Sequence, residues 1–219
     1  MDALLAAATE AAAGEVPRIV IVPVAAARQR PDLAAAHGEH AFGAAARRAG
    51  VVADVATASV VTREAAADPA LCARLDRAHL VHLPGGDPDL VPAVLRDTPA
   101  WAAILRASAR GACIAGASAG AMALAGRLWT RDGPMDGLGL VPGLAVLPHF
   151  SPARLDAWRT AVEAGGEPLA WLGLDERTMA IGRPGAPWTA VGPGRVHPIP
   201  PGALAAIRPA GHGERFVIG

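Results

Sequence analysis

Short runs of mostly apolar residues alternate with alanine-rich segments along the first half of the chain. The runs span residues 18–24, 51–55, 80–83 and 112–117. A continuous apolar run rich in β-branched residues is typical of a strand that is buried on both faces of a parallel sheet. The pattern therefore predicts a sheet whose strands are these four runs.

The alanine-rich segments are long enough to be crossover helices between those strands. They span residues 40–48, 62–77 and 99–110, and a further segment, 119–125, follows the last run. Alternating strands and helices predict a doubly wound α/β fold, with helices on both faces of a mainly parallel sheet. We expect residues 1–15 to form an exposed helical extension that carries no chemistry.

From Trp129 onward the chain contains more glycine and proline, and its apolar runs are short. These runs span residues 144–147, 169–172, 179–181 and 188–191. Short runs bounded by turn residues indicate an antiparallel or mixed extension of the same sheet. Because no repeat and no long polar linker is visible, residues 1–219 are expected to form a single domain.

The composition excludes several classes of partner. Hydrophobic residues make up 52% of the 219 residues, which favours a packed globular domain over a disordered chain. Twenty acidic residues balance twenty basic ones, all of them Arg, so the basic surface of a nucleic-acid binder is missing. The longest uncharged stretches, residues 111–126 and 137–153, contain Gly or Pro and are too weak to span a membrane. A small molecule or a peptide is the expected partner.

Cysteine and histidine usage argues against a metal site. Cys72 and Cys113 have no metal-ligand spacing and form no disulfide framework, which suits a reducing compartment. His79 and His82 are three residues apart on a predicted strand and therefore point to opposite faces. With no basic region or long apolar run at the N-terminus, no signal peptide is expected. These features predict a cytoplasmic protein without a metal or a cofactor.

Residues 116–120, with the sequence GASAG, carry the strongest indication of chemistry. They lie between a predicted strand and a predicted helix, which is the setting of a nucleophile elbow. A serine on such a tight turn needs small neighbours, and the N–H of Ala119 can face a developing oxyanion. The alternative is a chance arrangement in a glycine-rich chain. The setting favours Ser118 as a nucleophile.

His149 and the pair Gly85-Gly86 follow other predicted strands. His149 comes after the run 144–147, so its ring can reach the sheet edge where Ser118 lies and act as a base. From the residues alone, a structural histidine is the alternative. Paired glycines let backbone N–H groups approach a ligand, so Gly86 is a candidate second oxyanion donor, with a plain turn as the alternative. The chain has no Lys, which argues against a phosphate-binding loop.

Together these motifs resemble a known family. The glycine pair, the segment GASAGA, Pro-His-Phe at residues 148–150 and Gly-Leu-Asp-Glu at residues 173–176 are similar to those of the serine peptidases that include aspartyl dipeptidase (peptidase E) and cyanophycinase. The resemblance extends from about residue 19 to 191. It implies a class I glutamine-amidotransferase-like fold.

The resemblance also implies catalytic roles. Ser118 would be the nucleophile, His149 the general base and then the acid, and Gly86 with Ala119 the oxyanion donors. Two acids are candidates for the third member of the triad: Glu176 and Asp132 each match an acid of the family. Glu176 ranks first because a strand end holds a carboxylate against an imidazole better than a Gly/Pro loop does. Asp175 would then belong to a turn or support the site.

Two departures from the family bear on the substrate. Asp87 stands where the family usually has Asn after the glycine pair, and the segment after His149 is shorter than in aspartyl dipeptidase. Strict specificity for aspartyl residues is therefore not expected. Asp87 could hold a terminal ammonium group, and Arg154 or Arg159 a terminal carboxylate. The alternative is that both arginines only solvate a helix.

The preferred interpretation is a serine exopeptidase that acts on short peptides, with a homodimer as a further expectation. It would be either a dipeptidase that removes an acidic N-terminal residue or a carboxypeptidase. One alternative is an α/β-hydrolase-type esterase that uses Ser118, Asp175 and either His197 or His212, although the chain is short for that fold. Another is a non-catalytic amidotransferase-like binding protein that keeps the elbow as a scaffold.

Overall fold

The computed structural model describes residues 1–162, 168–203 and 208–218. The chain contains two compact units, residues 1–120 and 121–219. The first is a parallel α/β unit and the second is built mainly of mixed and antiparallel strands. The expectation that residues 1–219 make one domain stays a prediction.

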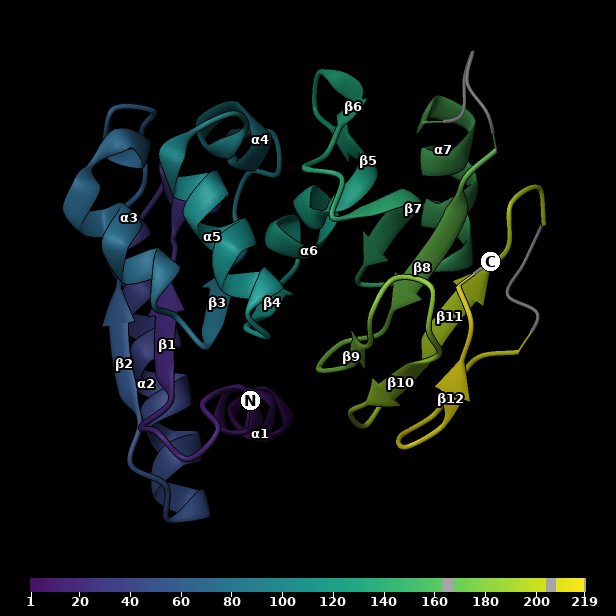
Figure 1. Cartoon of the computed structure of the whole chain (residues 1–219). Helices are drawn as coiled ribbons and strands as arrows, with labels where there is room; N and C mark the ends of the chain where they lie inside the picture. Colours follow the sequence, from purple (N-terminus) through teal and green to yellow (C-terminus); the bar gives the residue numbers. More distant parts are fainter. Residues whose placement is uncertain (163–167, 204–207, 219) are drawn as a thin grey trace. The chain divides into compact units, whose positions relative to one another are not determined.

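The first unit contains a parallel sheet in the order β2-β1-β3-β4 (Figure 1). Its strands are β1 (Arg18–Ile21), β2 (Asp54–Thr57), β3 (Leu80–Leu83) and β4 (Cys113–Gly116). Each strand pairs in parallel with its neighbours, as predicted. Strand β2 begins three residues later than the predicted run, because the exposed Val52 belongs to the connection after the preceding helix.

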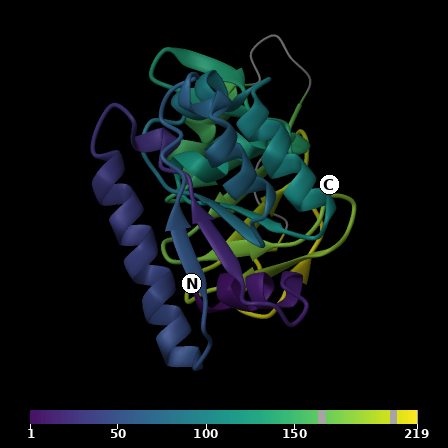
Figure 2. The same cartoon turned by 60° about the vertical axis from the view of Figure 1, so that its left-hand side comes forward.

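One helix precedes β1, and the others connect the strands. The helices are α1 (Asp2–Ala11), α2 (Pro31–Ala49), α3 (Pro69–Asp76), α4 (Leu90–Leu95) and α5 (Pro99–Ala109), with short 3-10 turns at Val24–Ala26 and Ala65–Ala67. The long helix α2 runs alongside β1 and β2 (Figure 2), while α3 and α5 pack against each other. Local sequence sets the helix ends. Asp68 accepts hydrogen bonds from the N–H groups of Ala70 and Leu71, and Gly50 ends α2 in a left-handed conformation.

The expectation of an exposed N-terminal helix is wrong. Helix α1 contacts α2, β3 and β4, and its residues Leu4, Leu5 and Ala8 are buried. The spacing of these three residues forms an apolar stripe on one face of the helix, which explains its packing. Alanine-rich composition concealed this stripe, because alanine is common at both buried and exposed helix positions.

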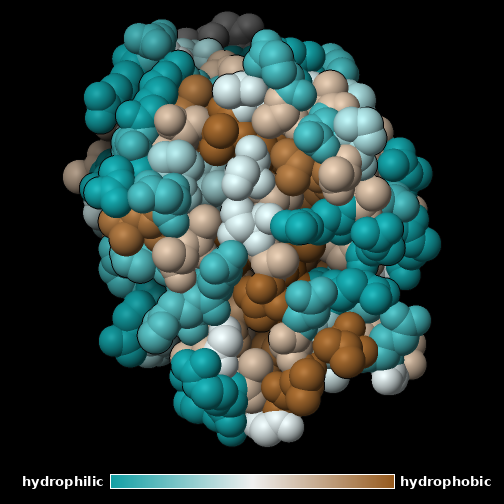
Figure 3. Space-filling model, turned by 90° about the vertical axis from the view of Figure 1, so that its left-hand side faces the viewer, coloured by the Kyte–Doolittle hydropathy of each residue, from teal (hydrophilic) through white to brown (hydrophobic). Residues whose placement is uncertain are grey.

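Large apolar side chains that reach the surface are scattered along the chain. They belong to Met1, Val16, Leu33, Val52, Leu105 and Val217. Figure 3 shows a face on which apolar and small residues form a strip between hydrophilic residues on either side. Scattered exposed apolar side chains such as that of Val52 are normal on globular domains.

The second unit contains a five-stranded sheet in the order β11-β8-β7-β5-β6 and a three-stranded sheet in the order β12-β10-β9 (Figure 1). The strands are β5 (Ala125–Thr130), β6 (Gly133–Asp136), β7 (Val141–Pro148), β8 (Ala170–Leu174), β9 (Met179–Ile181), β10 (Trp188–Val191), β11 (Val196–Ile199) and β12 (Arg215–Phe216). Strands β5, β7 and β8 are parallel, and the remaining pairs are antiparallel. The mixed pairing was predicted, but these strands pair among themselves in two sheets of their own.

Alternation along β7 builds the core of the second unit on both faces of the five-stranded sheet. Leu144 and Val146 pack with residues of the three-stranded sheet, including Phe216. The next residue, Leu147, packs on the opposite face of the sheet with Leu155 of helix α7 (Pro152–Val162). This packing fixes the register of β7, and with it the position of the residues that follow Pro148.

Candidate active site

Two loops leave the carboxyl edge of the parallel sheet in the first unit side by side. Leu83 of β3 and Gly116 of β4 are register partners, and the N–H of Ala117 donates to the carbonyl oxygen of Leu83 at 2.9 Å. The next residue, Ser118, has a φ of 49° in the left-handed region, which a serine rarely adopts. Helix α6 (Ala119–Leu124) begins immediately afterwards. The strand, strained serine and helix make the predicted nucleophile elbow.

Glycines allow the close approaches that this turn requires. A Cβ atom on Gly120 would lie 2.2 Å from the carbonyl oxygen of Leu83, so only glycine fits where α6 meets β3. A Cβ atom on Gly85 would lie 3.3 Å from the Cβ atom of Ser118, which places the glycine pair directly beside the elbow. Close packing therefore requires glycine at position 120, and the role of Ser118 as a nucleophile stays a prediction.

The loop after β3 is docked onto the segment that follows β1. Gly86 has a φ of 150°, and a Cβ atom there would lie 2.1 Å from the carbonyl oxygen of Ala25. The N–H of Asp87 donates to the same oxygen at 2.7 Å. This contact holds the glycine pair in place beside Ser118, and the role of Gly86 as an oxyanion donor stays a prediction.

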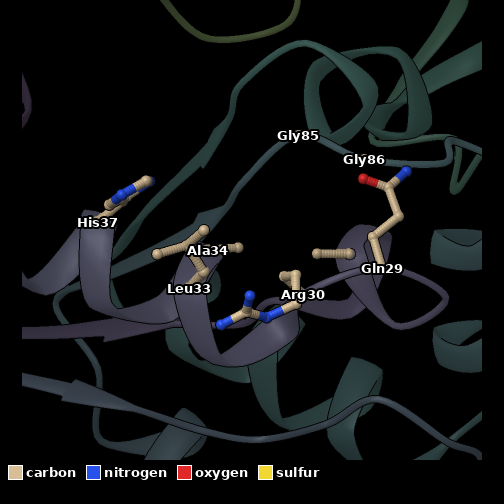
Figure 4. A pocket seen from close by; sticks show the side chains of 8 residues that line it. Gln29, Arg30, Leu33, Ala34, His37, Gly85 and Gly86 are labelled. Atoms are coloured by element: carbon tan, nitrogen blue, oxygen red, sulfur yellow. The ribbon is translucent and has the colours of Figure 1, made fainter.

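An open hollow of about 340 Å³ lies against the glycine pair (Figure 4). It is lined by Ala26, Gln29, Arg30, Leu33, Ala34, His37, Gly85 and Gly86. The side chain of Gln29 extends toward Gly86, whereas the guanidinium group of Arg30 turns away and binds Asp32 at 2.9 Å. Sequence reasoning did not single out Gln29, and it treated His37 as a surface residue; both side chains are exposed. No motif marks either residue, because Gln29 lies after the 3-10 turn at Val24–Ala26 and His37 lies within helix α2.

In the second unit, His149 and Glu176 are brought together by parallel strands. Pro148 and Leu174 are register partners at the ends of β7 and β8. The residues that follow leave the sheet at one edge, and the Nδ1 atom of His149 lies 2.5 Å from a carboxylate oxygen of Glu176. Both side chains are accessible, with 48% of His149 and 73% of Glu176 exposed. An exposed imidazole fixed by a carboxylate is suited to moving a proton to or from a substrate.

Asp132, the other candidate acid, lies in the turn between β5 and β6. Its N–H donates to Oγ1 of Thr130 at 3.2 Å, and its neighbours on both sides belong to the hairpin. Since β5 runs parallel to β7, this turn follows a strand end on the same edge of the sheet as His149. The carboxylate that the structure brings to the imidazole is nevertheless that of Glu176.

A second histidine–carboxylate pair lies next to the first. The Nε2 atom of His197 lies 3.0 Å from Oδ1 of Asp175, and Oδ2 of Asp175 accepts a hydrogen bond from the N–H of Arg195 at 2.9 Å. His212 instead accepts a hydrogen bond from the N–H of Gly192 through Nδ1. Of the two histidines that the esterase interpretation offered to Asp175, the structure therefore pairs it with His197.

The two candidate carboxylate-binding arginines make contacts with the chain itself. Arg154 donates to the carbonyl oxygens of Pro148 and His149, at 3.4 and 3.1 Å. Arg159 lies 3.7 Å from a carboxylate oxygen of Asp156 and also donates to the carbonyl oxygen of Ala203. Their role toward a substrate stays a prediction, and the structure adds a second role for Arg154 at the backbone of His149.

Within residues 1–162, 168–203 and 208–218, three or more His, Cys, Asp or Glu side chains never cluster in a way that could hold a metal ion. Among the helices of these same residues, none is both long and apolar enough to cross a membrane.

Burial raises the pKa of the Cys113 thiol, which disfavours the thiolate that a cysteine nucleophile needs.

Comparisons with known proteins agree with this geometry. The model of Peptidase family S51 matches residues 2–182. Among solved structures, a peptidase from an acI-B1 Actinobacterium is similar with a TM-score of 0.78 and 25% identity, over 98% of this chain and 88% of that one. A putative peptidase E protein from Listeria monocytogenes EGD-e has a TM-score of 0.54 and 15% identity, over 81% and 87% of the two chains, which shows the fold alone. A search of curated proteins found no match.

These comparisons confirm the sequence-based predictions of family resemblance and of fold class. The family match extends over nearly the whole chain and bears out the resemblance to the peptidase E group. The similarity to the actinobacterial peptidase bears out the α/β fold with a mainly parallel sheet. The roles of individual site residues stay predictions.

Proposed function

The chain belongs to peptidase family S51 and is a serine-type peptidase, and we propose that it is an exopeptidase that cleaves short peptides through an acyl-enzyme on Ser118. The observation that carries this proposal is the strained elbow at Ser118, with Gly85 packed directly beside it. A serine hydroxyl projecting from such a turn needs a base and a pair of oxyanion donors to attack a peptide carbonyl.

The catalytic cycle that we propose uses three residues in addition to Ser118. His149 takes the hydroxyl proton while the Ser118 oxygen bonds to the carbonyl carbon, and the N–H groups of Gly86 and Ala119 stabilise the oxyanion. The peptide C–N bond then breaks, and His149 returns the proton to the leaving amine. A water molecule, deprotonated by the same imidazole, hydrolyses the acyl-enzyme and restores the serine.

The hydrogen bond between His149 and Glu176 supports this assignment of the base. A carboxylate on Nδ1 leaves Nε2 as the atom that accepts the proton, and it stabilises the imidazolium that forms. The exposure of the His149 side chain, 48%, is compatible with access by a peptide. Asp132 is the second candidate for this orienting role.

Terminal recognition distinguishes the two branches of the proposed exopeptidase. In the dipeptidase branch, Asp87 holds the terminal ammonium group of a substrate with an acidic first residue. In the carboxypeptidase branch, Arg154 or Arg159 holds the terminal carboxylate. The hollow beside Gly86 is at the small end of the range for ligand pockets, roughly 300–1,000 Å³, which suits one end of a short peptide.

Covalent labelling tests the nucleophile. We expect a fluorophosphonate to modify the wild-type protein at Ser118, as located by peptide mapping, and to leave Ser118→Ala unlabelled. Ser108→Ala, in helix α5 of the same unit, is the matched control and should be labelled like the wild type. Well-folded Ser118→Ala that keeps more than about a tenth of wild-type peptidase activity would contradict the proposal.

A second candidate function is the esterase that uses Asp175 and His197. The 3.0 Å contact between these two side chains is the observation in its favour. Only 14% of the His197 side chain is exposed, however, which makes it the less accessible of the two bases. Alanine at position 149 and alanine at position 197, each assayed on peptides and on esters, separate the two candidates.

A further inference from the structure

We infer that Asp175, Phe150 and His197 form a positioning cluster that holds the His149–Glu176 pair in its working geometry. The inference rests on the proposed function of that pair, and it assigns the second histidine–carboxylate contact a supporting role rather than a catalytic one. Three observations in the second unit carry it: the backbone strain at His149, the packing of Phe150, and the division of two adjacent carboxylates between two histidines.

His149 has a backbone conformation that needs support from its surroundings. Its φ is 53°, in the left-handed region, which is uncommon and unfavourable for a residue with a Cβ atom. The contacts that hold it come from the following residue and from α7. The N–H of Phe150 donates to the carbonyl oxygen of Leu174 at 3.0 Å, and Arg154 donates to the carbonyl oxygen of His149.

The ring of Phe150 is held between a strand and an imidazole. On one side it covers Gly173 so closely that a Cβ atom there would lie 2.3 Å from the ring atom Cδ2. It also stacks on His197, with the ring centroids 4.0 Å apart and an angle of 21° between the planes. Because Gly173 and His197 are register partners on β8 and β11, both contacts belong to the rigid sheet.

Asp175 keeps His197 in the orientation that this stacking requires. One carboxylate oxygen lies 3.0 Å from Nε2 of His197, and the other accepts the N–H of Arg195. The adjacent residue, Glu176, binds His149. The consecutive carboxylates of Asp175 and Glu176 thus bind His197 and His149. Phe150 links these two histidines, because it follows His149 in the chain and its ring stacks on that of His197. Displacing His197 should therefore move His149.

Substitutions at His197 test this inference with peptide turnover. His197→Ala removes both the stacking and the contact with Asp175, and we expect kcat to fall about 10- to 100-fold with KM changed less than about twofold. His197→Phe keeps an aromatic ring on Phe150 but loses the contact with Asp175, so it should recover part of that loss. His212→Ala, which changes another hydrogen-bonded histidine of the same unit, is the matched control and should keep wild-type kcat.

The rate of fluorophosphonate labelling at Ser118 is the second readout, because it follows the action of the base and not substrate binding. It should fall with kcat in His197→Ala and recover in part in His197→Phe. If His197→Ala does not fold, Phe150→Leu keeps an apolar side chain over Gly173 without the ring stacking, and the same loss of kcat is expected.

Several outcomes would overturn the inference. Unchanged kcat and labelling rate in folded His197→Ala would show a purely structural role, even with a lower melting temperature. Equal losses in His197→Phe and His197→Ala would remove the role of stacking. Inactive His197→Ala beside active His149→Ala would make His197 the base. Activity in Ser118→Ala would instead refute the proposed function, so the two failures can be told apart.

Discussion

The Nδ1 atom of His149 lies 2.5 Å from Oε1 of Glu176, across 27 residues of sequence. The contact follows from strand register, because β7 and β8 are parallel and end together at Pro148 and Leu174. The two residues differ in how firmly their surroundings hold them. The backbone of His149 is strained and held by several neighbours, whereas the carboxylate of Glu176 is 73% exposed. Changes to the carboxylate should therefore affect catalysis more than folding.

Glu176→Gln should lower kcat strongly, by about 100-fold or more, while the melting temperature stays near that of the wild type. An amide can neither fix the imidazole tautomer in the same way nor stabilise the imidazolium. Asp132→Asn, in the turn after β5, is the matched substitution and should have a much smaller effect. Steady-state kinetics with a dipeptide and a tripeptide measure both variants. A larger loss in Asp132→Asn would make the hairpin acid the orienting group.

Gly120→Ala should destabilise the first unit, because the added Cβ atom would lie 2.2 Å from the carbonyl oxygen of Leu83. Relieving such an overlap requires backbone movement and costs about 1–3 kcal/mol. Gly43→Ala, in the middle of α2, is the control. Its new Cβ atom would meet only the end of the Arg47 side chain at 3.5 Å, so the free energy of unfolding should stay level or rise. Urea unfolding measures both, and equal stabilities would contradict the prediction.

His82 should make the stability of the protein depend on pH. Burial lowers the pKa of His82 to about 4, and its Nδ1 atom has no hydrogen-bond partner among the described residues. Since the folded pKa lies below the ordinary value of 6.5, protonation favours the unfolded chain. The stability that neutral His82 contributes is complete above about pH 6.5 and is lost as the pH falls toward 4, by about 3 kcal/mol in total.

Comparison with a side chain that does not titrate isolates this contribution. His82→Phe keeps a ring against Phe42, which His82 meets edge-on at a centroid distance of 5.5 Å. The free energy of unfolding, measured by denaturant at several pH values, should fall less steeply below pH 6.5 in the variant than in the wild type. Parallel curves for the two proteins would show that His82 is not the responsible group.

The sequence was sufficient for elements that are encoded locally. Strand β3 coincides with the predicted run, and the small residues around Ser118 predicted a turn that the structure shows as a strained elbow. Pairing between distant segments was not predictable in the same way, because a strand pattern does not specify its partner. The stacking of Phe150 on His197, for example, depends on the register between β8 and β11.

Burial was also misjudged where composition was uninformative. Helix α1 consists largely of alanine, and only its contacts with α2, β3 and β4 show that Leu4 and Leu5 belong to the core. Gln29 escaped notice for a related reason. It follows a strand and a 3-10 turn in a segment without a motif, and the hollow beside Gly86 appears only when the loop after β3 is docked on Ala25.

The terminus that the enzyme recognises separates the two branches of the proposed exopeptidase. An exopeptidase must bind a terminal charge at a fixed distance from its nucleophile, so blocking that charge should reduce kcat/KM more than changing neighbouring side chains. Matched tripeptides with an N-acetyl group, a C-terminal amide or both measure this directly.

Loss on acetylation supports the dipeptidase branch, and Asp87→Asn should then weaken binding of the free substrate. Loss on amidation supports the carboxypeptidase branch, and Arg159→Gln is then the informative variant. Arg154 is less suitable, because its guanidinium group also holds the carbonyl oxygen of His149 and its loss would disturb the base. If doubly blocked peptides are cleaved as fast as free ones, the exopeptidase assignment is wrong and an endopeptidase or an esterase takes its place.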